Sequence, residues 1–102
     1  MTKITVKTSD KVEVTQAQAR AIEEGKKFYL RMADKEPQRV NDLANGDKKE
    51  FARLQFVSKQ FAINTGVAYP WTELFEPLNN MHAYDLNKAI LKDYIVKEVG
   101  AE

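Results

Sequence analysis

The sequence contains no cysteine, and among its 102 residues there is one histidine and one tryptophan. Without cysteine there is no disulfide, no thiolate metal site and no cysteine nucleophile. The single histidine, His82, has no Gly-x-Ser-x-Gly turn to activate, and no acidic run has the spacing of a metal-binding loop. The four glycines are scattered, which excludes a glycine-rich phosphate loop. We therefore expect a protein that is not an enzyme and that uses no catalytic residue, cofactor or metal.

An excess of charge of one sign is also missing. Sixteen basic residues face fifteen acidic ones, for a net charge of +1. Such a balance provides no bulk attraction to nucleic acid or to anionic membranes. The chain has no apolar run typical of a signal peptide or a membrane span. We expect a cytoplasmic protein without a membrane partner.

What is present is the composition of an ordinary globular protein, with 43% hydrophobic and 30% charged residues. A chain of this length buries roughly 65% of its unfolded surface, which is enough for a core without staples. We expect residues 1–102 to form a single globular domain.

Strict alternation of apolar and polar residues near both ends predicts a small sheet. Residues 2–8 and 11–14 alternate, and a three-residue loop between them would place their apolar side chains opposite one another in a hairpin. Residues 94–99 alternate again and are predicted to form a strand. Because an isolated hairpin is marginal in water, we expect this strand to join it in an antiparallel sheet.

Helix signals fill the region between these strands. Thr15 and Gln18 form a capping-box pattern, which predicts a helix over residues 16–34. Pro37 is expected to begin a short helix that ends at the cap pair Asn45-Gly46.

A second capping-box pattern, Asp47 with Glu50, opens the helix that we expect at the centre of the core. Apolar residues recur there at intervals of three and four, at Phe51, Leu54 and Phe61 among others. The predicted fold class is therefore α+β, mostly helical with three to five helices and a small antiparallel sheet.

Two further positions carry local predictions. Gly25 interrupts the first helix, so it marks a close packing contact or a break in the helix. Asp85 is expected to cap a final helix in which Leu86, Ala89 and Ile90 share one face.

The aromatic segment, residues 66–84, contains the only tryptophan, the only histidine and two of the three prolines. Tyr69, Trp71, Phe75 and Tyr84 are residue types that anchor protein interfaces, and prolines lower the cost of ordering such a segment. They are the candidate partner-binding residues. The alternative is that Trp71 and Phe75 cover the helical core, and the sequence leaves both possibilities open.

A nucleic-acid surface is the second hypothesis. The short helix at Pro37 and the helix from Asp47 have roughly a helix-turn-helix outline, in which Lys48, Lys49 and Arg53 would face the groove. Acidic residues lie among these cations at pairing distance, which favours ordinary solvated helix faces.

The run of residues 85–98, a helix followed by a turn and a Tyr-x-Val strand, is similar to the end of many short accessory proteins of Gram-positive phages and prophages. The run Lys11-Val-Glu-Val followed by a helix also resembles them, although Lys92-Asp93 stands where such proteins often have Asp-Gly. The resemblance implies a small non-enzymatic protein that binds a host or phage component. Inhibitors of bacterial defence, anti-CRISPR proteins among them, belong to that population.

Together these observations predict a protein-binding module that modulates or inhibits a host protein, for example a defence component such as a CRISPR effector. One alternative is a DNA-binding transcriptional regulator that uses the helix from Asp47. Another is a self-associating phage structural or assembly subunit, possible as a homodimer because unmatched strand edges and aromatic patches also pair identical chains.

Overall fold

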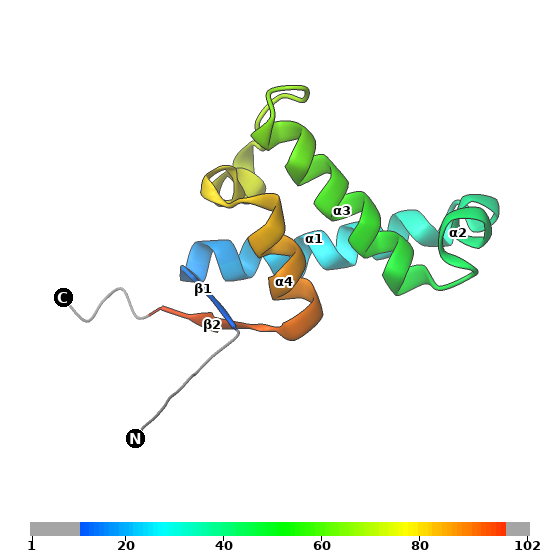
Figure 1. Ribbon diagram of the computed structural model, residues 1–102, viewed down its shortest axis with the longest axis horizontal. Helices are drawn as coiled ribbons and strands as arrows, with labels where there is room; N and C mark the ends of the chain where they lie inside the picture. The colour runs from blue at the N-terminus through cyan, green and yellow to red at the C-terminus, as the bar shows by residue number, and fades with distance from the viewer. Residues whose placement is uncertain (1–10, 98–102) are drawn as a thin grey trace, which may run out of the picture.

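Two short strands, one before and one after the helices in the chain, lie side by side in the computed structural model, which describes residues 11–97 (Figure 1). In chain order the elements are β1 (Val12–Val14), α1 (Gln16–Asp34), α2 (Pro37–Ala44), α3 (Lys48–Asn64), the 3-10 helix η1 (Glu73–Asn80), α4 (Ala83–Lys92) and β2 (Tyr94–Val96). The prediction of a mostly helical α+β fold with a small sheet is confirmed.

The start of α1 is the capping box that the sequence predicted. The Thr15 hydroxyl accepts from the Gln18 backbone N–H at 3.0 Å, and the Gln18 side chain accepts from the Thr15 N–H at 3.0 Å. These two bonds satisfy two N–H groups that a helix start otherwise leaves without partners. The helix ends at Asp34, as expected.

Gly25 does not break α1 but marks its closest contact with α3. A Cβ atom at this position would lie 2.2 Å from the Cζ of Phe56. Only a residue without a side chain allows the Phe56 ring to lie directly on the α1 backbone. Of the two predictions for Gly25, the packing contact is confirmed.

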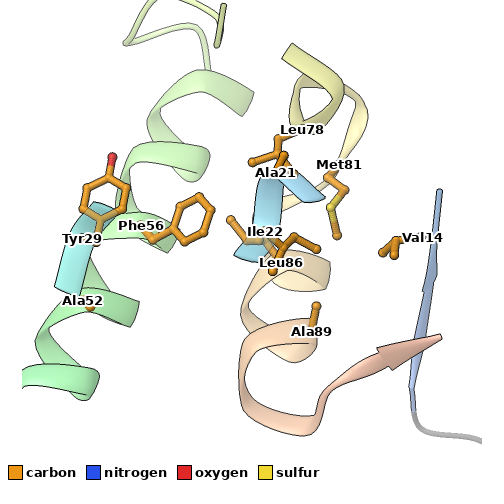
Figure 2. Close-up of a cluster of buried hydrophobic side chains, with 10 residues drawn as sticks. All are labelled: Val14, Ala21, Ile22, Tyr29, Ala52, Phe56, Leu78, Met81, Leu86 and Ala89. Atoms are coloured by element: carbon orange, nitrogen blue, oxygen red, sulfur yellow. The ribbon is translucent and has the colours of Figure 1, made fainter. Parts of the chain in front are cut away.

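The main core lies where α1 meets α3, η1 and α4 (Figure 2). Ile22, Phe56, Leu78 and Leu86 are at most 1% exposed and come from these four helices, one from each. A smaller cluster packs α2 against the end of α1 and the start of α3; its members are Ala33, Val40, Ala44 and Phe51. The predicted end of α2 is also confirmed, since Asn45 is left-handed with φ 53°.

The predicted buried face of α3 is partly wrong. Phe51 is buried as expected, but Phe61 is 59% exposed, and Phe56 and Gln60 occupy the interior instead. The reason is that α3 crosses α1 at Gly25, so the side of α3 that carries Phe56 faces α1. The capping box is also half formed: the Asp47 carboxylate accepts from the Glu50 N–H at 3.1 Å, while the Asp47 N–H donates to the Ala44 carbonyl.

The predicted antiparallel sheet is wrong. The sheet consists of β1 and β2 in parallel, with Val12 opposite Tyr94 and Val14 opposite Val96. All the helices lie between these strands in the chain, and such a long connection allows the second strand to return in the same direction as the first. The predicted first strand of the hairpin, residues 2–8, lies outside the described residues.

The cap of α4 also differs from the prediction. The residue before the helix is His82, whose Nδ1 accepts from the Tyr84 backbone N–H at 3.1 Å. Asp85 lies inside the first turn, where a carboxylate interacts favourably with the helix dipole. The expected apolar face is present, since Leu86 and Ala89 are buried.

No helix within residues 11–97 has both the length and the apolar character that crossing a membrane requires.

Candidate protein-binding surface

Trp71 and Phe75, two of the predicted partner-binding residues, lie together against the core. Their ring centroids are 5.4 Å apart, and the Trp71 ring meets Phe56 edge-on at 5.9 Å. The Trp71 indole N–H donates to Gln60 Oε1 at 2.7 Å. Both aromatic residues are half-buried, so they combine core packing with a partly accessible surface.

The backbone of Trp71 is held by the Asn79 side chain. Asn79 Oδ1 accepts from the Trp71 N–H at 2.7 Å, and Asn79 Nδ2 donates to the Trp71 carbonyl at 2.9 Å. These two bonds pair the backbone N–H and the carbonyl of Trp71 with one side chain, and they hold Trp71 against η1. The chain is therefore fixed directly after the loop that precedes Trp71.

The other end of that loop is closed by the last turn of α3. The Val67 and Ala68 N–H groups both donate to the Ala62 carbonyl, at 2.8 and 3.1 Å, and Gly66 adopts φ 81° to allow this turn. We call residues 65–70 the tip loop. Within it, Val67 is 82% exposed and Tyr69 is 92% exposed. Two apolar side chains thus project into solvent from a backbone that is anchored on both sides.

Tyr84, the fourth predicted residue, lies apart on the first turn of α4 and is 66% exposed. No ring contact within residues 11–97 joins Tyr69 or Tyr84 to the cluster of Trp71 and Phe75. The four predicted residues therefore do not form one compact site.

Two surface residues escaped the sequence analysis. Phe61 was assigned to the core but lies exposed near the end of α3, and it lines a shallow hollow with Thr65 and His82. Val67 lies between Gly66 and Ala68 and belongs to no periodic pattern of apolar residues. One feature of the sequence could have indicated both residues: residues 60–72 include no charged side chain, although 30% of the chain is charged.

The three residues predicted to bind nucleic acid lie near the start of α3, and they differ in how many contacts they make within the chain. Lys48 Nζ forms an ion pair with Asp34 at 2.8 Å. The Arg53 guanidinium donates to both Glu50 carboxylate oxygens and, at 2.6 Å, to Asn87 Oδ1. Lys49 has no ion pair with any described residue.

Lys49 and Arg53 also line a cleft of about 490 Å³ between α1, α3 and α4. Apolar side chains from all three helices contribute to its lining, and charged residues surround them. The lining residues are Glu23, Lys26, Lys27, Leu30, Asp47, Lys49, Glu50, Ala52, Arg53, Phe56, Ile90 and Leu91.

Two tyrosines beside this cleft have a raised pKa: Tyr29, through burial, and Tyr94. The Tyr94 hydroxyl donates to Glu23 at 2.6 Å, which joins β2 to α1. The pKa of Tyr94 is raised to about 12, mainly by burial. The hydrogen bond to Glu23 and the negative charges of Glu23 and Asp93 add to this shift. Among residues 11–97, no three histidine or acidic side chains gather closely enough to hold a metal ion.

Comparison with known proteins found no matching family model, no matching curated protein and no matching solved structure.

Proposed function

We propose that this protein is a small non-enzymatic binding module and that the tip loop makes the central contact with a partner protein. The observation that supports this most strongly is the exposure of Val67 and Tyr69, at 82% and 92%, on an anchored backbone. Side chains this exposed bury almost no area within the chain, so they contribute little to its folding. On a partner they would supply the apolar and aromatic contact that dominates interface energy.

Anchoring of the tip loop lowers the cost of binding. The hydrogen bonds to Ala62 on one side and to Asn79 on the other already restrain the backbone, and Pro70 restrains it further. A partner would therefore order little more than the side chains of Val67 and Tyr69.

The surroundings of the loop also resemble an interface centre. Charged residues are depleted at the buried centre of protein interfaces, and residues 60–72 contain none. Phe61 extends the apolar surface from the end of α3, and Trp71 and Phe75 would form its partly accessible border. Tyr84 is a separate candidate contact.

We extend the proposal to the biological setting that the sequence resemblance implies. The protein would act as a phage or mobile-element accessory protein that binds a host protein in the cytoplasm. A component of a bacterial defence system, such as a CRISPR effector, is the example of such a target that we expect.

The test is affinity capture of the tagged protein from a bacterial lysate, with and without nuclease, followed by mass spectrometry. The test variant is the double substitution Val67→Ser and Tyr69→Ser. The matched control is Leu43→Ser, which removes an apolar residue that is 53% exposed on α2.

We expect a stoichiometric protein that survives nuclease, is retained by Leu43→Ser and is lost with the double variant. A partner that binds the double variant as well as the wild type would contradict the proposal. Capture that disappears with nuclease would instead favour the DNA-binding alternative. That alternative has weaker support, because Lys48 and Arg53 are engaged in contacts within the chain.

A further inference from the structure

The cleft between α1, α3 and α4 shares no residue with the tip loop. Its α1 wall carries Glu23, Lys26, Lys27 and Leu30, whose spacing of three and four places them on one helix face. The opposite wall belongs to α3. Because α4 adds a third wall through Ile90 and Leu91, the cleft is bounded by three helices.

The apolar part of the lining comes from all three walls. Phe56 is held in place by its stack on Tyr29, with ring centroids 5.2 Å apart, and by its contact with Gly25. Leu30 and Ile90 are partly buried, and Leu91 is 59% exposed. An apolar guest would therefore meet a surface that is already formed.

The carboxylates of the cleft are all engaged within the chain. Glu23 accepts from Tyr94 and Lys26, and Glu50 accepts from Arg53. Asp47 caps α3 by accepting from a backbone N–H.

The cations of the cleft are less fully engaged. Lys49 has no ion pair within residues 11–97, and the ammonium of Lys27 meets only Glu24, at 3.7 Å, with its side chain 66% exposed. The lining carries four cations and three carboxylates, so its net charge is positive.

The size of the cleft indicates a small molecule. Its volume of about 490 Å³ lies within the range of roughly 300–1,000 Å³ that is usual for small-ligand sites. Two turns of an α-helix, about 10 Å wide and about 11 Å long, occupy roughly 850 Å³. A partner helix would not fit inside, whereas an alkyl chain of about ten carbons would.

We infer that this cleft binds a small amphipathic anion, with an apolar body against Leu30, Ile90 and Leu91 and a carboxylate at the ammonium of Lys49. The apolar body supplies the binding free energy, because its transfer from water removes apolar surface from solvent. Lys49 gives the site its preference for an anion, because the cations of the lining outnumber its carboxylates and Lys49 has no ion pair with a described residue.

The test is titration of the isotope-labelled 102-residue chain with sodium decanoate, monitored by the NMR chemical shifts of the backbone amides. Decyltrimethylammonium, which has the same chain length and the opposite charge, is the ligand control. We expect saturable decanoate shifts centred on the lining residues of α1, α3 and α4, and at least about fivefold weaker binding of the cation.

Lys49→Glu should weaken decanoate binding about tenfold, because it replaces attraction by repulsion. Arg20→Glu, an exposed residue outside the cleft with the same change in charge, should leave binding within about twofold. Leu91→Ser should also weaken binding by removing part of the apolar wall.

Several outcomes would overturn the inference. It would be wrong if decanoate and decyltrimethylammonium bound with equal affinity, or if the shifts centred on the tip loop. It would also be wrong if decanoate caused no saturable shifts. An effect of Lys49→Glu no larger than that of Arg20→Glu would exclude the specific role of Lys49. The tip-loop double variant should bind decanoate normally, so failure of this inference and failure of the proposed function can be told apart.

Discussion

The indole N–H of Trp71 donates to Gln60 Oε1 at 2.7 Å, and this bond completes the hydrogen bonding of a fully buried amide. The Gln60 amide nitrogen donates to the Leu78 and Met81 carbonyls, both at 2.9 Å. One side chain of α3 therefore contacts Trp71, the end of η1 and the residue before His82, the cap of α4. The position of the tip loop depends on this buried network, because the loop ends directly before Trp71.

Replacing Gln60 should destabilise the protein strongly. Gln60→Leu keeps most of the volume but leaves the Trp71 N–H without a partner. It also removes one of the two donors to each of the Leu78 and Met81 carbonyls, which still accept from the Met81 N–H and from Asn64 Nδ2. We therefore expect the free energy of unfolding to fall by about 1–3 kcal/mol. Urea denaturation followed by circular dichroism would measure this. Gln38→Leu, at an exposed position of α2, should change it by no more than about 0.5 kcal/mol. Equal effects of the two variants would show that the Gln60 network contributes little.

Gly25→Ala should destabilise the protein although alanine is the better helix former. The helix-propensity gain is about 1 kcal/mol. The new Cβ would lie 2.2 Å from Phe56, which cannot move freely because it is 1% exposed and stacked on Tyr29. We expect a net loss of about 1–3 kcal/mol of unfolding free energy.

A double-mutant cycle with Phe56→Leu provides the control for Gly25. The two substitutions together should cost less than the sum of their separate effects, because the smaller side chain leaves room for the Cβ. Strict additivity, or a stabilised Gly25→Ala variant, would contradict the close contact between α1 and α3.

Ionisation of Tyr94 should lower stability at high pH. Its pKa is about 12 in the folded chain and about 10 in the unfolded chain, so the folded protein holds this proton more tightly. The stability that protonated Tyr94 contributes is fully present below pH 10 and is lost as the pH rises from 10 to 12. Denaturant unfolding at a series of pH values would show it.

Tyr94→Phe is the comparison that isolates this contribution. Burial also raises the pKa of Tyr29, which adds a fall of the same sign in both proteins. The stability of the phenylalanine variant should therefore decline less than that of the wild type between pH 10 and 12. Parallel curves would mean that the hydrogen bond from Tyr94 to Glu23 is not maintained in solution.

Even a conservative substitution of Arg53 should lower the stability of the protein. Its guanidinium contacts Glu50 on its own helix and Asn87 on α4, and its side chain is 17% exposed. Lysine cannot reproduce this fork of donors, so Arg53→Lys should lower the unfolding free energy by about 1–2 kcal/mol. Arg39 is 51% exposed and contacts Glu36 and the Phe51 ring without joining two packed helices through a fork of hydrogen bonds, so Arg39→Lys should cost about 0.5 kcal/mol or less. Thermal unfolding of both variants would decide whether Arg53 joins α3 to α4.

Local signals were sufficient to predict most helix ends. The capping box at Thr15, the proline at the start of α2 and the Asn45-Gly46 cap act through hydrogen bonds and dihedral angles within a few residues. His82 escaped prediction as the cap of α4 because histidine is an uncommon cap, and Asp85 offered a stronger pattern three residues later.

The candidate site was predicted only in outline. The sequence indicated that the aromatic segment was unusual, and Tyr69 is indeed exposed. It left open whether Trp71 and Phe75 would pack against the core, as both do, and it did not show that Phe61 would lie outside the core. Those outcomes depend on the face of α3 that meets α1, and the pattern of apolar residues along α3 allowed more than one face.

By itself, then, the sequence determined the four α-helices but not η1, together with a small sheet from strands near the two ends and the absence of cysteine chemistry, because composition and short-range bonding decide these features. The tertiary structure alone decided the parallel pairing of β1 with β2, the buried network at Gln60 and the cleft beside Lys49. Each of these brings together segments that are 11 to 82 residues apart in the chain. Their partners meet only when the helices pack together, and no local pattern carries that information.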